Sequence, residues 1–272
     1  MNIRRWLLAL AAFGVLGYIS PSVAAPSTTT CSLSTLKGSW AGASTPRLPS
    51  GLPSSFSWLY MEYWDGAGNA AWMQFNSYGT STSGWVQGTN KYTVSSNCSA
   101  NDLWGPLSGP VTSYVNPDGS GLLDIPFSPN SGKVNANTYV TISRVSLPAA
   151  TSTCSNKTLS GTYATSTVEY NAGVALGYFS RRSFSANGTY TYIDIVENGT
   201  TVTPRNRTGT YTVAGNCTAY FYDNGATTPT YAAIVAPNSS QYWWLNITND
   251  GTFATGHATQ ISPSLVNNAS YP

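Results

Sequence analysis

The stretches KYTVSSNCSA (residues 91–100) and TYTVAGNCTA (residues 210–219) decide the fold, because the same strand and corner occur twice in the chain. In each copy an alternating Tyr-Thr-Val strand runs into a polar corner that ends in Asn-Cys-Ser/Thr-Ala. Upstream lies a second shared segment, CSLSTLKGSW at residues 31–40 and CSNKTLSGTY at residues 154–163. The repeated order of Cys, Gly-x-aromatic, Tyr-x-Val and Cys indicates a tandem duplication.

The composition is that of a globular β protein with few charges. Of the 272 residues, 41% are hydrophobic, 13% are aromatic and only 8% are charged. Ser, Thr, Asn, Gly and Tyr are abundant, whereas Lys and Arg are scarce. A chain with 12 basic and 10 acidic residues lacks the positive surface that binds nucleic acid or an anionic membrane. We therefore expect no nucleic-acid partner.

The first 25 residues are typical of a secretory signal peptide. Arg4 and Arg5 form a basic start, an apolar run extends from Trp6 to about Leu16, and small residues lead to Ala25. This apolar run is shorter than the roughly 20 residues that a membrane-spanning helix needs. We therefore expect an exported protein without a membrane span, located in the periplasm or outside the cell.

The four cysteines fall two to a repeat, at equivalent positions. Of the three possible pairings, Cys31 with Cys98 and Cys154 with Cys217 follow most simply from duplication. Each such bridge would stabilise the fold by roughly 4 kcal/mol through loop-closure entropy. The cysteines lack C-x-x-C spacing and the chain has one histidine, so we expect neither a metal nor a cofactor.

Short alternating runs separated by Gly, Asn and Pro turns predict about eight strands in each repeat. Such strands, joined by tight hairpins, form an antiparallel meander, and eight of them are enough to close a barrel without free edges. We therefore predict an all-β chain of two tandem eight-stranded antiparallel up-and-down barrels. The expected units are the signal peptide (1–25), a first barrel (26–147), a second barrel (154–263) and a C-terminal tail (264–272).

Strand parity in the aligned repeats predicts which side chains face inward. Met73 and Phe75 match Ile193 and Ile195 of the second repeat. Because all four are apolar, we expect this face of the strand to be interior. The alternate residues, Trp72 with Tyr192 and Gln74 with Asp194, should then point outward or between the barrels.

The segment Gly38-Ser39-Trp40, followed by seven further predicted strands with Arg144 on the last, resembles the lipocalin-like, or calycin, β-barrels. The resemblance implies that Trp40 packs near the base of the barrel beneath Arg144. Repeat two keeps Gly161-Thr162-Tyr163 but has no Arg in its last strand, which offers His257 or Gln260 instead.

The mature chain also resembles a kind of secreted lipocalin-like domain that carries Gly-x-Tyr-x-Val followed by Asn/Asp-Cys-Thr. Residues 209–213 and 216–218 match this signature. The resemblance implies a lipocalin-like fold. It does not indicate which ligand is bound, because such domains are mostly uncharacterised.

Glu62 is a charge within an apolar strand, and the equivalent residue in repeat two is Arg182. If these side chains face inward, each barrel holds one ionisable group that could orient an otherwise apolar ligand. The alternatives are a rim charge that reaches water or an internal salt bridge such as Arg182 with Glu169. The candidate ligand-binding residues, in phase on these two strands, are Trp58, Tyr60, Glu62, Trp64, Tyr178, Arg182 and Phe184.

The sequence offers no catalytic constellation. His257 is the only histidine and no Gly-x-Ser-x-Gly elbow occurs, so no nucleophilic triad can be assembled. Three functions stay open, and we favour the first. They are a non-enzymatic protein that binds a small, mainly apolar ligand; a barrel cyclase that resembles allene oxide cyclase, with a carboxylate such as Glu62 as its electrostatic element; and a structural or carbohydrate-contacting surface protein.

Overall fold

The computed structural model describes residues 30–46, 57–78, 80–103, 110–128, 133–134, 138–145, 153–171, 174–198, 201–250 and 252–261. The predicted signal peptide and C-terminal tail lie outside these residues. The described chain is all-β, with two single-turn 3-10 helices, η1 (Leu33–Leu36) and η2 (Asn156–Leu159). Within the described ranges, no helix has the length and apolar character needed to cross a membrane.

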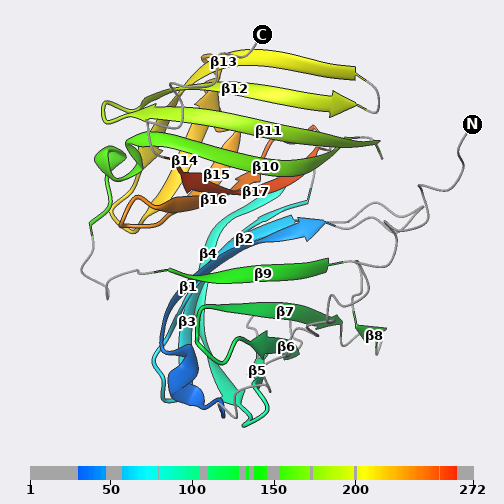
Figure 1. The fold of residues 1–272 in the computed structure, drawn as a ribbon, viewed down its shortest axis with the longest axis vertical. Coiled ribbons are helices and arrows are strands. Elements are labelled where there is room, and N and C mark those ends of the chain that lie inside the picture. Colours follow the sequence, from blue (N-terminus) through cyan, green and yellow to red (C-terminus); the bar gives the residue numbers. More distant parts are fainter. Residues whose placement is uncertain are drawn as a thin grey trace, which may run out of the picture.

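The second repeat forms a closed antiparallel barrel of eight strands, as predicted. Each strand pairs with the next one along the chain, and β17 pairs back with β10 (Figure 1). Closure leaves this sheet without an exposed edge. The strands are β10 (Gly161–Asn171), β11 (Val174–Ser185), β12 (Thr189–Asn198), β13 (Thr201–Val213), β14 (Thr218–Asp223), β15 (Tyr231–Val235), β16 (Gln241–Asn246) and β17 (Phe253–Gln260).

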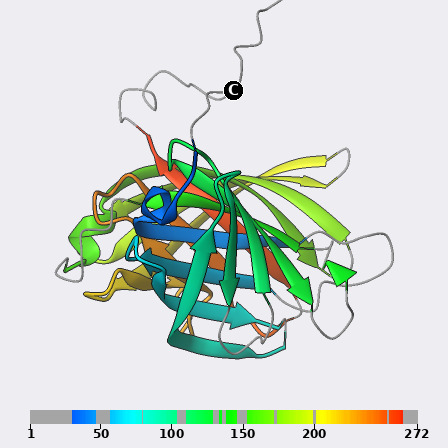
Figure 2. The same ribbon diagram turned by 90° about the horizontal axis from the view of Figure 1, so that it is seen from below.

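The first repeat forms a curled antiparallel sheet of nine strands, seen from below in Figure 2. The strand order is β6-β5-β4-β3-β2-β1-β9-β7-β8, and β6 additionally pairs with β7. A complete first barrel stays a prediction. The strands are β1 (Gly38–Pro46), β2 (Ser57–Trp64), β3 (Asn69–Ser77), β4 (Thr82–Val94), β5 (Ser99–Leu103), β6 (Pro110–Val115), β7 (Gly121–Ser128), β8 (Lys133–Val134) and β9 (Thr138–Val145).

Both repeats begin with the same local structure. Ser32 and Ser155 each start a 3-10 turn with a capping box. Gly38 and Gly161 follow with φ angles of 137° and 135°, a conformation that side chains rarely adopt and that glycine tolerates. The shared sequence segment therefore gives the same turn and the same first strand in each repeat.

Both predicted disulfides are formed. The Cα atoms are 4.9 Å apart in Cys31–Cys98 and 5.0 Å apart in Cys154–Cys217. Each bridge ties the start of a repeat to the corner that follows its fourth strand. Two such bridges are typical of a protein that folds in an oxidising environment.

The predicted faces of β3 and β12 are wrong. Glu62 lies opposite Trp72 in the β2–β3 pairing, and directly opposed residues share a face. Trp72 is therefore inward with Glu62 and only 8% exposed, whereas Phe75 contacts the second repeat. In repeat two, Ile193 faces out and is 37% exposed. The register of the hairpin decides which face of the strand lies inward. Phe75 is apolar because it is buried between the repeats and not inside the first sheet.

A hydrophobic cluster joins the two repeats. Outward side chains of the first sheet meet outward side chains of β15 and β16, which lie between the two halves in Figure 1. The rings of Phe75 and Tyr220 meet edge-on with centroids 6.3 Å apart. Leu59, Ile234 and Leu245 are fully buried in this cluster. Each such side chain contributes about 1.5–3 kcal/mol on burial, so the repeats are packed against each other.

Candidate functional site

Arg182 lies on the inward face of β11 in the second barrel. The register places Tyr163 opposite it on β10 and Tyr192 opposite it on β12. Its side chain is 2% exposed, so it is buried and does not lie at a solvent-exposed rim. Large aromatic side chains cluster in this barrel's core, namely Tyr163, Phe184, Tyr190, Tyr211, Phe221, Tyr242 and Trp244.

Three aromatic rings surround the Arg182 guanidinium. Its central carbon lies 5.0 Å from the ring centroids of Tyr192, Tyr231 and Trp244. Desolvated cation–π contacts of this kind are worth about 2 kcal/mol each. The Nε and Nη1 groups of Arg182 have no hydrogen-bond acceptor among the described residues. The rings thus stabilise the charge, while two buried donors remain available.

The Tyr242 hydroxyl lies close enough to the Arg182 guanidinium to interact with it, but the contact does not have the geometry of a normal hydrogen bond. Burial raises the pKa of Tyr242, and the positive charge of Arg182 opposes that rise. The Tyr242 hydroxyl therefore stays protonated. It adds a further polar group to the lining around the guanidinium.

Asp223 is the centre of a buried polar network. Its carboxylate accepts hydrogen bonds from the hydroxyls of Tyr190 and Tyr192. Arg207 Nη1 lies 3.8 Å from Asp223 Oδ2. Burial, followed by the charge of Asp223, raises the pKa of Tyr190, so this hydroxyl remains a donor. The network balances the Asp223 charge, and the Arg182 guanidinium takes part in none of these hydrogen bonds.

Two further carboxyl groups line the inward face beyond Arg182. Ser180 donates to Asp194, and burial raises the pKa of Asp194, which Ser180 and Arg182 counteract. Tyr178 donates to Glu169 Oε1 at 3.3 Å, and burial also raises the pKa of Glu169. The alternative ion pair of Arg182 with Glu169 is not formed in the described part of the barrel.

Glu62 is buried inside the first repeat and is 1% exposed. Its Oε2 atom accepts a hydrogen bond of 2.8 Å from Trp64 Nε1. Trp58, Tyr60 and Trp64 belong to one buried cluster. The rim position considered for Glu62 is therefore excluded, and the carboxylate lies among large aromatic side chains.

The seven candidate residues form two groups, one inside each repeat. Tyr178, Arg182 and Phe184 share the inward face of β11 and are each at most 8% exposed. Sequence reasoning missed Asp223 as a lining residue and expected Asp194 to face outward. The turn Ala186-Asn187-Gly188 could have revealed that Asp194 faces inward. This turn sets the register of the β11–β12 hairpin, and that register pairs Ser180 with Asp194.

Trp40 and Arg144 are direct partners in the β1–β9 pairing. Trp40 is fully buried, and its Nε1 donates to the Leu36 carbonyl at 2.8 Å. In the second repeat Tyr163 occupies the place of Trp40, and Gln260 lies opposite it. Of the two residues that the sequence offered for this closing position, Gln260 is therefore the one in register.

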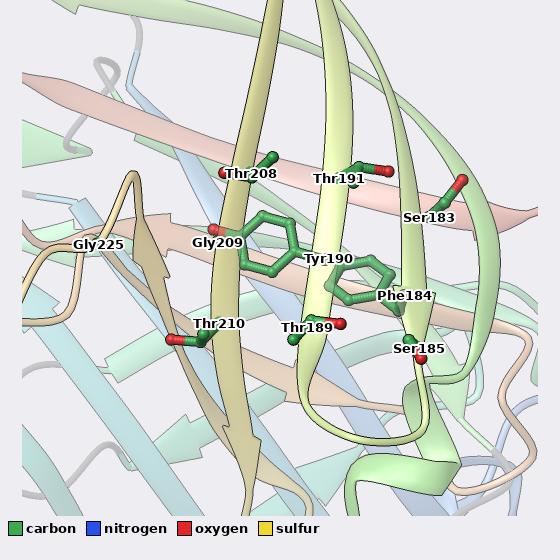
Figure 3. A pocket seen from close by; sticks show the side chains of 10 residues that line it. All are labelled: Ser183, Phe184, Ser185, Thr189, Tyr190, Thr191, Thr208, Gly209, Thr210 and Gly225. Atoms are coloured by element: carbon green, nitrogen blue, oxygen red, sulfur yellow. The ribbon is translucent and has the colours of Figure 1, made fainter.

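Each repeat also carries an open pocket on the outside of its second, third and fourth strands. The pocket on β11–β13 has a volume of about 570 Å³, and that on β2–β4 about 470 Å³. Figure 3 shows the first of these, with hydroxyl side chains above and below the rings of Phe184 and Tyr190. No three His, Cys, Asp or Glu side chains gather to hold a metal among the described residues.

Comparison with known proteins gives no function. No family model matches the chain, and no curated protein matches it. Among solved structures, a protein of unknown function from the DUF3598 family of Nostoc punctiforme is 11% identical, with a TM-score of 0.28, over 85% of this chain and 99% of that one. The Helicobacter pylori beta clamp in complex with carprofen is 6% identical, with a TM-score of 0.16, over 84% of this chain and 59% of that one. Similarities this low support no functional argument.

Proposed function

We propose that the protein is an exported, lipocalin-like binding protein, without catalytic activity, that takes a small, mainly apolar ligand into its second barrel. The single observation that carries this proposal is Arg182, whose Nε and Nη1 groups have no acceptor although the side chain is 2% exposed. A buried donor without an acceptor costs about 1–3 kcal/mol. A ligand that brings one acceptor group would recover that cost.

The surroundings of Arg182 fit such a ligand. The rings of Tyr192, Tyr231 and Trp244 supply apolar surface, and a few polar or charged groups among mainly apolar walls are the usual composition of a small-molecule site. The acceptor would contact the guanidinium, while the apolar part of the ligand would lie against the rings. Tyr178 and Phe184, on the same face of β11, would flank it.

The wider assignment rests on the arrangement of the strands and on the disulfides. The pairing of β6 with β7, added to the β7–β9 and β9–β1 pairings, supports a second closed barrel in the first repeat. The two disulfides and the basic, then apolar, start of the chain support export to the periplasm or the exterior.

Titration with the fluorescent probe 1-anilinonaphthalene-8-sulfonate tests the proposal, because this probe joins apolar rings to an acceptor. We expect Arg182→Gln to weaken probe binding at least tenfold. Arg181→Gln is the matched control, because adjacent strand residues point to opposite faces, and it should leave binding unchanged. Equal affinity of both variants and the parent protein would refute a site at Arg182. Native mass spectrometry of protein purified from its own host would identify a bound ligand directly.

A further inference from the structure

The outward pocket of the second barrel carries a regular array of hydroxyl groups, which we call the hydroxyl pocket. In the sheet register, Ser185 and Thr189 are paired, and Thr189 is paired with Thr210. The next row is formed in the same way by Ser183, Thr191 and Thr208. Two rows of three hydroxyl side chains thus cross β11, β12 and β13, as the two levels of Figure 3 show.

Sheet geometry sets the spacing of this array. Neighbouring strands lie about 4.8 Å apart, and alternate residues of one strand lie about 7 Å apart. Thr191, Thr208 and Thr210 are exposed on this surface. Their hydroxyls therefore face solvent at regular intervals along two directions.

Buried rings beneath the array hold its backbone in place. The Tyr190 ring occupies the space next to Gly209, where an added Cβ would lie 2.5 Å from it. The Tyr190 hydroxyl is bound to Asp223, and the rings of Tyr190 and Phe184 stack with centroids 5.3 Å apart. The hydroxyl array is thus pre-organised, which lowers the entropic cost of binding.

The chemistry of the lining selects a class of ligand. A Ser or Thr hydroxyl both donates and accepts hydrogen bonds, and none of the ten residues that line this pocket carries a charge. An ionic ligand would lose hydration here without gaining a charged partner. A neutral molecule with many hydroxyls would exchange its water hydrogen bonds for equivalent ones, while the threonine methyls contact its C–H groups.

We propose that the hydroxyl pocket is a second binding site, outside the barrel, for a neutral oligosaccharide that lies across the strands. The corresponding pocket of the first repeat is chemically different. It contains Asp65, Lys91 and the 43% exposed Tyr63, and we assign no saccharide to it. The two pockets thus lie at equivalent places on the two repeats, and of the two only the pocket of the second repeat has an uncharged lining.

Nuclear magnetic resonance titration with cellohexaose and maltohexaose tests this site. We expect at least one of these hexasaccharides to shift amide signals of β11–β13 around the hydroxyl pocket. The triple variant Thr191→Val, Thr208→Val, Thr210→Val keeps the shape but removes three hydroxyls, and it should bind at least tenfold more weakly. Valine favours strands, so the fold is expected to persist. If the triple variant unfolds, Thr191→Val alone replaces it.

Two controls separate this proposal from the interior site. Thr212→Val changes an exposed threonine on β13 outside the pocket and should bind like the parent protein. Arg182→Gln removes the interior anchor and should leave saccharide binding unchanged. The proposal is overturned if neither hexasaccharide shifts these signals, or if the triple variant and Thr212→Val bind equally well.

Discussion

Glu62 and Arg182 occupy equivalent positions of the two repeats, and both are buried inside their own sheet with opposite charges. Glu62 is opposite Trp72, and Arg182 is opposite Tyr192. The two copies therefore kept one inward position for an ionisable residue beside an aromatic ring. What differs is how each charge is held, because Glu62 accepts a hydrogen bond from Trp64, whereas Arg182 lies among rings.

The first prediction concerns Gly256, which lies opposite Trp244 in the β16–β17 pairing. A Cβ at this position would lie 2.4 Å from the Trp244 indole. We expect Gly256→Ala to displace that ring and lower the free energy of unfolding by about 1–3 kcal/mol, as overpacking does. Gly215→Ala is the control, because nothing lies within 4 Å of its added Cβ. Urea denaturation of both variants measures the difference, and equal stability would contradict the prediction.

A second prediction concerns Asp65, in the turn between β2 and β3. Its carboxylate accepts hydrogen bonds from the Asn69 side chain at 2.5 Å and from the backbone N–H groups of Asn69 and Ala67 at 3.0 and 2.6 Å. These bonds, led by the Asn69 side chain, lower the pKa of Asp65 to about 2. A lowered carboxyl pKa stabilises the fold above the ordinary value of 3.8, and this stabilisation is lost as the pH falls towards 2.

Nuclear magnetic resonance titration of the Asp65 carboxyl carbon measures this pKa. Asn69→Ala removes the largest cause, so the pKa of Asp65 should rise towards its ordinary value. An Asp65 that titrates near 3.8 in the parent protein would show that the turn bonds do not persist in solution.

A third prediction concerns the pH dependence due to Asp194. Burial raises the pKa of Asp194 above its ordinary value of 3.8, so the folded protein binds more protons there than the unfolded chain does. Stability from this residue is therefore greatest below 3.8 and falls as the pH rises through the folded pKa. In Asp194→Asn that fall should disappear. Chemical denaturation of both proteins, from below pH 3.8 upward, measures their free energies of unfolding. The prediction is contradicted if the parent protein becomes more stable relative to Asp194→Asn as the pH rises.

A fourth prediction concerns the contact between the repeats. Leu59 is fully buried against residues of β15 and β16. We expect Leu59→Ala to cost about 2–5 kcal/mol of unfolding free energy, as truncations in packed cores do. Ile193→Ala, at a 37% exposed position, should change stability by about 0.5 kcal/mol or less. Similar melting temperatures for the two variants would mean that the repeats do not pack through Leu59.

The sequence by itself determined the duplication, the all-β class, the eight strands of the second barrel and both disulfides. These features are local or repeated, so periodicity, turn residues and the spacing of Cys154 and Cys217 are enough to predict them. Tertiary structure alone decided which face of β3 and β12 lies inward. The register of the β2–β3 hairpin places Trp72 beside Glu62, and that of the β11–β12 hairpin places Asp194 beside Ser180. In either hairpin a shift of one residue would reverse the face. The ring cage of Arg182 likewise comes from β12, β15 and β16, which only the closure of the barrel brings together.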